Sequence, residues 1–143
     1  MLLAIPIIVS IFSLVFAYFL IAEIKKSPTG SGKMLEVSWA IREGAMAFLK
    51  RQYKTVAIAA AVLFLIILLT LGIKSAFGFL IGALASAFSG FVGMNISTQA
   101  NVKVAEMAKK GLGQALSLAF KGGSVTGFLV AGLGLLSVSV FYW

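Results

Sequence analysis

The distribution of charged residues constrains this chain more than any other feature of its sequence. Four long stretches carry no Asp, Glu, Lys or Arg, namely residues 1–22, 55–73, 75–102 and 122–143. A helix needs about 20 apolar residues to cross about 30 Å of hydrocarbon. Barrel strands are shorter and alternate in polarity, so helices are the only membrane-spanning structure that fits. The pattern predicts four transmembrane helices, at about residues 2–22, 55–73, 76–97 and 124–143.

The composition agrees with a chain that is dissolved in lipid. Of the 143 residues, 61% are hydrophobic and 11% are charged, whereas soluble domains carry about 25% charged residues. The chain has no Cys, His or Asp, which excludes disulfides and thiolate metal sites. Hydrolytic and metal sites mostly draw on these residue types. We therefore assign no catalytic, substrate-binding or metal-binding residue to this chain, whose acidic residues are Glu23, Glu36, Glu43 and Glu106.

The basic residues predict how the chain is oriented in the membrane. Eleven of the twelve lie in the segments 23–54 and 98–123, and only Lys74 lies between the second and third spans. Cytoplasmic loops carry an excess of Lys and Arg, so both segments are expected to be cytoplasmic and both termini to be outside. The net charge of +8 is then a topology signal, with contact to anionic lipid as an addition. Nucleic-acid binding is not expected, because no platform of aromatic and basic residues accompanies the charge.

The first span is interpreted as an uncleaved anchor. Its apolar stretch is longer than that of a signal peptide, no Lys or Arg precedes it, and no small-x-small cleavage site appears before Glu23. Lys25 and Lys26 follow it instead, as expected for an anchor whose N-terminus is outside. A cleaved signal peptide remains the alternative interpretation.

Residues 33–54 show the periodicity of a helix. Their apolar residues recur at steps of three and four, which places on one stripe Met34, Val37, Ile41, Ala45 and Phe48. Such a helix either lies at the membrane surface or runs straight into the second span. Two interpretations of its stripe remain open, a surface anchor or a docking face for another cytoplasmic part of the same protein. Helix-breaking residues precede it at 27–32, and a second break is expected at 111–113.

Neither glycine-rich break fits a phosphate-binding loop. Residues 30–33 read Gly-Ser-Gly-Lys, but the required earlier Gly is missing, Met34 follows the Lys, and a membrane helix precedes the loop. Residues 111–113 lack the third Gly of a dinucleotide-binding turn and no strand leads into them.

Small residues predict close helix packing in the third and fourth spans. The third span has small residues at every fourth position, namely Gly78, Gly82, Ser86 and Gly90, and the fourth has Gly123, Gly127 and Ala131. Small residues at this spacing let helix backbones approach each other closely in lipid. A transport path is the alternative, but no ionisable residue lies inside spans two to four. Polar residues at the cytoplasmic end of the third span are expected to cap or bond helices, namely Asn95, Thr98, Gln99 and Asn101.

Five short strings, in this order along the chain, resemble one known family. They are GSGKM at 30–34, EGAMAFLKRQYK at 43–54, GFVGMN at 90–95, ANVK at 100–103 and AFKGGSVTG at 119–127. Together they resemble the N-terminal part of membrane-bound pyrophosphatases, which are pyrophosphate-energised proton or sodium pumps. The resemblance extends from about residue 25 to the C-terminus. The stretches at 93–96 and 124–127 are more similar to the potassium-independent proton pumps.

The resemblance implies a larger protein than this chain. Members of the family are homodimers of chains with about sixteen helices in an inner and an outer ring, and they hydrolyse pyrophosphate with magnesium while pumping an ion outward. The Asp-rich motifs that hold magnesium lie on later helices, so no catalytic residue of the family can be placed here. The resemblance implies an outer-ring, N-terminal fragment in a prokaryotic plasma membrane. The alternatives are a stand-alone four-helix scaffold or assembly protein and a small transporter built from several copies.

The predicted topology can be tested by thiol labelling. Cysteines introduced at positions 30 and 112 lie in the two basic segments, so we expect them to be shielded from a membrane-impermeant thiol reagent in intact cells. Labelling of either cysteine from outside would contradict the predicted orientation.

Overall fold

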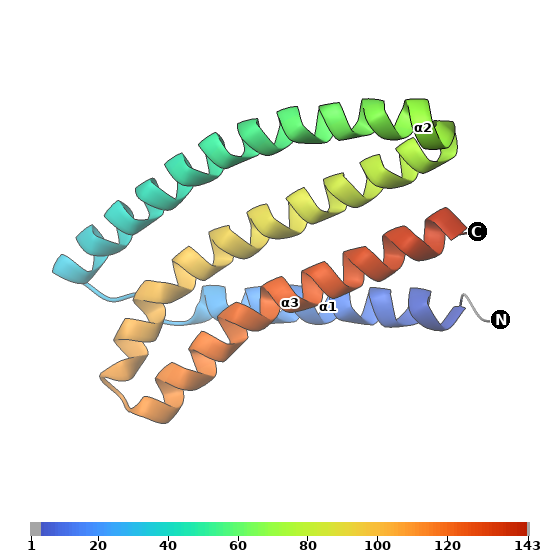
Figure 1. Ribbon diagram of the computed structural model, residues 1–143. Helices are drawn as coiled ribbons and strands as arrows, with labels where there is room; N and C mark the ends of the chain where they lie inside the picture. The colour runs from blue at the N-terminus through green and yellow to red at the C-terminus, as the bar shows by residue number, and fades with distance from the viewer. Residues whose placement is uncertain (1–3, 143) are drawn as a thin grey trace.

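The computed structural model describes residues 4–142, which form three long helices (Figure 1). These are α1 (Ala4–Lys26), α2 (Lys33–Ala108) and α3 (Leu112–Tyr142). The first connection falls at the break predicted for 27–32, whereas the second, at 109–111, begins two residues before the break predicted for 111–113. All three helices are long and apolar enough to cross a membrane. The outermost residues of the predicted first and fourth spans lie outside the described residues.

The structure has three helices where the sequence predicted four, because two predicted spans lie in one helix. The spans at 55–73 and 76–97 are both part of α2, which turns back on itself at Gly72 (Figure 1). Gly72 has φ 82° and ψ 177°, a conformation that residues with a side chain rarely adopt. The reversal is so tight that helical geometry resumes directly on both sides. Residues 33–71 are called the first arm below, and residues 73–108 the second arm.

The two basic segments between the predicted spans, 23–54 and 98–123, are mostly helical. The first arm has no break between the amphipathic stretch and the apolar stretch, so the helix runs straight from one into the other. At about 1.5 Å per residue the first arm is about 58 Å long, roughly twice the hydrocarbon thickness. The turn between α2 and α3 includes only residues 109–111, with Gly111 at φ 144°. The two basic segments are therefore helix extensions joined by short connections.

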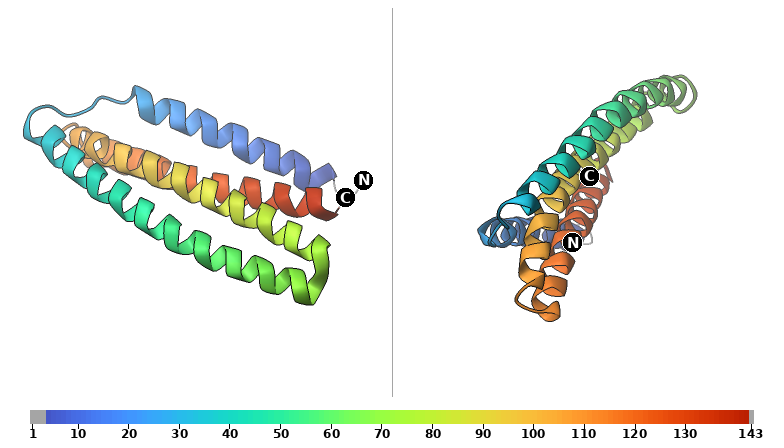
Figure 2. Two further views of the ribbon diagram at one scale, coloured as in Figure 1. Left: turned by 90° about the horizontal axis from the view of Figure 1, so that it is seen from above. Right: turned by 90° about the vertical axis from the view of Figure 1, so that its left-hand side faces the viewer.

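The ends of the helices are sorted into two groups. The beginning of α1, the end of α3 and the reversal at Gly72 lie at one end of the bundle, and the two connections between helices lie at the other (Figure 2). Ala4 and Tyr142 thus lie on one side, and the clustered Lys residues beside the two connections lie on the other. Within the first connection Gly30 is buried, so its exposed neighbour Ser31 is the better position for a labelling cysteine.

The buried residues recur at alternating steps of three and four. On α3 this seam consists of Ala115, Leu118, Gly122, Val125, Leu129, Gly132 and Ser139. On α1 it consists of Ser10, Ser13, Ala17, Leu20 and Ile24. On the second arm it includes Ser89, Gly93, Ile96, Ala100 and Lys103. A spacing of about 3.5 residues keeps a buried stripe facing its neighbour, as in left-handed helix bundles.

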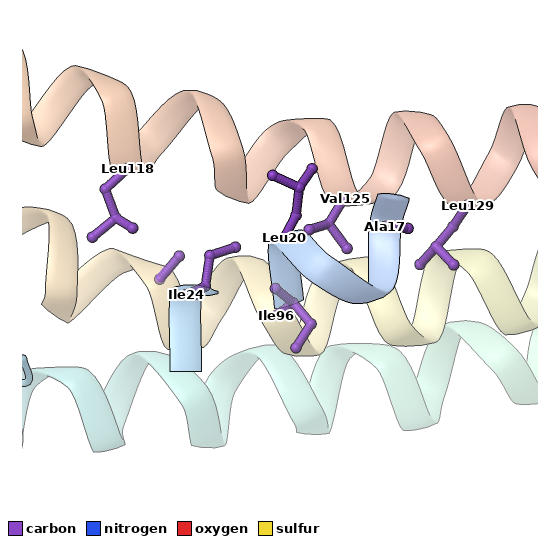
Figure 3. Packing of buried hydrophobic residues seen from close by; sticks show 8 residues of the cluster. Ala17, Leu20, Ile24, Ile96, Leu118, Val125 and Leu129 are labelled. Carbon is purple, nitrogen blue, oxygen red and sulfur yellow. The ribbon is translucent and has the colours of Figure 1, made fainter. Parts of the chain in front are cut away.

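The core lies along α3, which packs against both α1 and the second arm (Figure 3). Direct contact between α1 and α2 is slight. Ile24 and Val125 are the largest side chains that are fully buried, and aliphatic residues from all three helices surround them. The helix α3 is therefore the common partner that places α1 and the second arm relative to each other.

Glycines on the seam allow the backbones to come close. A Cβ atom at Gly93 would lie 2.5 Å from Thr126 Oγ1 and 2.9 Å from its Cγ2. A Cβ at Gly132 would lie 3.0 Å from Leu14 and 3.1 Å from the carbonyl oxygen of Ser10. Lipid tails are as apolar as Leu, so close van der Waals contact between small residues is a main source of helix association in a membrane.

The predicted small-residue stripes are only partly correct. On the second arm, Gly78 packs against Phe141 and Gly90 against the Tyr53 hydroxyl, whereas Gly82 has no atom within 4 Å of its Cβ position. Gly82 instead lines a cavity of about 210 Å³ between the second arm and α3. On α3 the predicted stripe of Gly123, Gly127 and Ala131 is wrong, because all three residues are exposed. The contacts are made instead by the buried seam, which includes Gly122 and Gly132.

The first arm packs far less than the other helices. Leu49 is its only buried residue, and no residue of its most apolar stretch is buried. It is joined to the second arm by Tyr53, whose hydroxyl donates a hydrogen bond of 2.5 Å to the carbonyl oxygen of Ala87. The Tyr53 ring also meets Phe91 edge to face, with centroids 6.5 Å apart. The fold is therefore a packed three-helix unit with a loosely attached fourth segment.

The seam predicts opposite effects for two glycine-to-alanine substitutions on the same arm. Gly93→Ala forces a methyl group into Thr126 and should lower the free energy of unfolding by about 1–3 kcal/mol. Gly82→Ala meets empty space, so helix propensity should leave stability unchanged or raise it by up to about 1 kcal/mol. Thermal unfolding of both variants in detergent measures the difference. Equal shifts for the two would mean that the seam is placed wrongly.

Candidate functional site

The main polar contact between helices lies where α1 ends. Lys103 of the second arm is only 7% exposed. Its ammonium group donates hydrogen bonds to the carbonyl oxygens of Lys25, at 3.1 Å, and Ser27, at 2.5 Å. The last carbonyls of a helix have no partner within the helix and carry the negative end of its dipole. Lys103 therefore caps α1 from a neighbouring helix.

The position of Lys103 follows from the seam of the second arm. It comes three residues after Ala100 and seven after Ile96, so its Cβ lies on the same buried stripe. Its aliphatic stem can then cover apolar surface while the ammonium group reaches the helix end. Burial lowers the pKa of Lys103, because a desolvated ammonium is less stable than a hydrated one. The two carbonyl oxygens replace part of the lost hydration.

Two ion pairs accompany this contact. Lys121 of α3 pairs with Glu23 of α1, and so joins the same end of α1 to a second helix. Lys109, just after the end of α2, pairs at 2.6 Å with Glu106, three residues earlier in the chain. These side chains are partly or largely exposed to solvent, where such pairs contribute about 0–1 kcal/mol. Lys103 is the more heavily buried of the polar contacts that hold α1 in place.

The polar residues that were expected to cap or bond helices make their bonds along α2. Gln99 Nε2 donates to Asn95 Oδ1 at 3.0 Å, and Thr98 Oγ1 donates to the carbonyl oxygens of Met94 and Asn95. Asn101 is exposed. None of these side chains reaches another helix through a bond that the described residues show. The buried position of Lys103 was not predicted, although its register with Ile96 and Ala100 indicates it.

The apolar stripe of residues 33–54 is mostly uncovered. Val37, Ile41 and Phe48 are exposed, whereas Met34 and Ala45 are half-buried. Part of the stripe faces the end of the second arm across a groove of about 400 Å³. The two interpretations of this stripe, as a surface anchor or as a docking face, both remain predictions.

The acidic residues do not form a site for a divalent cation. Glu23 and Glu106 are paired with lysines, and Glu36 and Glu43 are two turns apart on the first arm. Within residues 4–142 no three metal-ligating side chains come together. Magnesium prefers several oxygen ligands including carboxylates, so these residues do not fit a magnesium site. That the chain carries no catalytic, substrate-binding or metal-binding residue remains a prediction.

Comparison with known proteins identifies the family of this chain. Residues 11–143 match the family described as inorganic H⁺ pyrophosphatase. The chain belongs to this family. The sequence resemblance from about residue 25 onward is thereby confirmed, and the match extends it into the first helix.

Similar pyrophosphatase-family proteins are much longer than this chain. It is 48% identical over 132 residues to a protein of Methanosarcina mazei named K(+)-insensitive pyrophosphate-energized proton pump, covering 91% of this chain and 20% of that protein. It is 46% identical over 134 residues to a second pump so named, from Moorella thermoacetica, covering 92% of this chain and 20% of that protein. A putative K(+)-stimulated pyrophosphate-energized sodium pump of Clostridium tetani is 39% identical over 121 residues, which are 85% of this chain and 18% of that protein. The chain spans about a fifth of the length of these relatives.

Membership of this family places the chain in a membrane, with its three helices as candidate spans. In this setting Lys103 lies on the helix extension beyond the apolar part of the second arm, close to the end of α1. The polar contacts that tie α1 to the other helices therefore lie at the basic end of the bundle.

Removal of the Lys103 ammonium should loosen α1. Lys103→Met keeps a long apolar side chain but deletes both hydrogen bonds, so we expect a loss of about 1–3 kcal/mol in the free energy of unfolding. Lys110→Met is the matched control, because Lys110 is exposed. Thermal unfolding in detergent gives the stabilities. Identical values for the two variants would show that the Lys103 contact contributes nothing.

Proposed function

We propose that this chain is the N-terminal, outer-ring segment of a membrane pyrophosphatase that couples pyrophosphate hydrolysis to outward proton pumping. The observation that carries the proposal is the match of residues 11–143 to the family, with 48% identity to a relative named as a proton pump. Proton pumping is favoured over sodium pumping because the relatives at 48% and 46% identity are named as proton pumps. Their names also favour a pump that does not require potassium.

The proposed topology has four spans in one transmembrane unit, residues 1–143. Spans at about 2–22, 55–73, 76–97 and 124–143 leave both termini outside and the segments 23–54 and 98–123 in the cytoplasm. The reversal at Gly72 supports two crossings by α2, because it brings the second arm back beside the first. The basic residues at the opposite end of the bundle support the orientation. The membrane is proposed to be a prokaryotic plasma membrane.

The role of the segment in such a pump is structural. Its carboxylates do not form a magnesium site, so magnesium and pyrophosphate would be bound by helices of the pump outside this segment. Its partners are the lipid bilayer and those remaining helices, within a homodimer. The three-helix seam would hold the outer ring in register around the helices that perform the chemistry. The alternative function is that of a stand-alone membrane scaffold, in which the same helix packing would stabilise a protein that is not part of a pump.

A segment exchange separates these two functions. The aligned 132 residues of the Methanosarcina mazei pump are replaced by the corresponding residues of this chain, and pyrophosphate-driven proton uptake is measured in membrane vesicles. We expect the chimera to retain proton uptake, because a segment that is 48% identical should fold and pack as the replaced one does. The 143-residue chain alone, in vesicles with magnesium and pyrophosphate, should release no phosphate. A chimera that reaches the membrane at the parental level but pumps no protons would contradict the proposal.

A further inference from the structure

A long apolar groove lies between the two arms of α2. Its volume is about 620 Å³, and it is called the inter-arm groove below. Small residues on both arms keep the facing helix surfaces shallow, and its lining includes Ala57, Ala61 and Leu65 of the first arm and Ala83, Leu84 and Ala87 of the second. The groove lies along the charge-free stretch that is proposed to cross the membrane, so hydrocarbon and not water surrounds it there.

The cytoplasmic end of the groove is defined by Tyr53. Tyr53 lines the groove, and its hydrogen bond to the carbonyl oxygen of Ala87 ties the two arms together at this level. The next residue, Lys54, is the last charged residue before the charge-free stretch of the first arm. The groove therefore begins where the hydrocarbon is proposed to meet the headgroups. Tyrosine is enriched at this level of a membrane.

Two lysines stand above the groove on the same face of the first arm. Steps of three and four along a helix return to one face, so Lys50, Lys54, Ala57, Ala61 and Leu65 form a continuous row. Ala57, Ala61 and Leu65 line the groove. Side chains on a helix also lean toward its N-terminus, which directs both lysines away from the hydrocarbon. The row thus changes from cationic to apolar at the headgroup level.

The two lysines lack an anion. Both are exposed, and neither takes part in an ion pair within the part of the chain that the structure describes. Like charges four residues apart on a helix repel each other, and Arg51, also exposed, adds a third positive charge beside them. An anion between Lys50 and Lys54 would relieve this repulsion. At this depth the abundant anions are lipid phosphates of the cytoplasmic leaflet.

We propose that the inter-arm groove binds one acyl chain of an anionic phospholipid whose phosphate is held by Lys50 and Lys54. The inference rests on the proposed topology, in which the first arm crosses the membrane. Charge complementarity favours a lipid over a further helix as the occupant, because an apolar helix would fill the groove but leave the lysines unneutralised. Basic groups beside grooves between transmembrane helices recognise anionic headgroups in this way.

The expected preference for an anionic lipid follows from the two charges. Each basic residue near the membrane surface favours an anionic lipid by about fivefold. The groove should therefore prefer phosphatidylglycerol to phosphatidylcholine, and each lysine that is removed should lower that preference by about the same factor.

Quenching of a tryptophan in the groove by brominated lipids tests the inference. Phe64→Trp places a reporter in the lining about 15 Å below Lys54 along the helix, in a chain whose native Trp39 and Trp143 are replaced by Phe. The chain is reconstituted in unbrominated phosphatidylcholine. In one series an increasing fraction of the lipid is replaced by phosphatidylglycerol brominated on the acyl chain, and in the other by phosphatidylcholine brominated in the same way. Leu69→Trp, at a side chain that is 85% exposed, reports on bulk lipid in parallel.

We expect the reporter at position 64 to be quenched at lower fractions of brominated phosphatidylglycerol than of brominated phosphatidylcholine. The reporter at position 69 should respond equally to both. Lys50→Gln with Lys54→Gln should abolish the preference, whereas the matched control Lys74→Gln, at the opposite end of the first charge-free stretch of α2, should leave it unchanged.

Other outcomes overturn the inference in distinguishable ways. A preference that survives both lysine substitutions, or no preference at position 64, would show that these lysines hold no headgroup. Quenching at position 69 but not at position 64 would show that protein covers the groove, and the topology would stand. A lack of quenching at both positions would contradict the membrane crossing itself, and with it the proposed topology on which the inference rests.

Discussion

Close backbone contact along α3 is the interaction on which this fold depends. The hydrophobic effect cannot drive helices together in lipid, because the tails are as apolar as the side chains. The remaining attraction is van der Waals contact, which falls off within a fraction of an ångström. The backbone of the second arm lies close to the Thr126 side chain at Gly93. The backbone of α3 lies close to the Leu14 side chain at Gly132. The helix α3 thereby packs against both α1 and α2, which make only slight contact with each other.

The first arm of α2 shows what happens where such contacts are missing. It is the most apolar part of the chain, yet its side chains remain exposed apart from Leu49 and a few half-buried residues. In water this surface would be unstable, whereas in a bilayer lipid or other helices of a pump would cover it. Its alanines leave a groove where the glycines of the seam allow contact. Small residues thus allow helix contact where a facing helix approaches closely, and leave a groove where it does not.

Much of this fold could be predicted from the sequence, since charge-free length and helix-breaking residues act locally. The break predicted at 27–32 lies between α1 and α2, and the one predicted at 111–113 overlaps the connection between α2 and α3 only at Gly111. The joining of two spans in α2 was not predicted, because one glycine can reverse a helix without any loop sequence to signal it. The face of α3 that packs was predicted one position away, because Gly122 and Gly123 are equally small and only the facing helix distinguishes them.

The candidate site was harder to predict, because its chemistry depends on contacts between distant residues. Lys103 lies in a segment whose charge signals a cytoplasmic location, and counting charges treats it like its exposed neighbours. Its register with Ile96 and Ala100 turns its side chain toward the end of α1, 78 residues earlier in the chain. That the chain holds no metal or catalytic site is argued from composition, since a chain without Asp, His or Cys has few ligands to assemble, and it stays a prediction.

The lysines of this chain therefore have different physical roles, although the proposed topology places all of them except Lys74 on one side of the membrane. A buried ammonium such as that of Lys103 needs fixed acceptors, and the end of α1 supplies carbonyl oxygens that no helix partner uses. The more exposed Lys121 pairs with the carboxylate of Glu23, and an exposed pair of this kind contributes little to stability. Lys50 and Lys54 have neither kind of partner in the described chain. Their positive charge therefore remains available to the membrane surface, where anionic lipid is the complementary group.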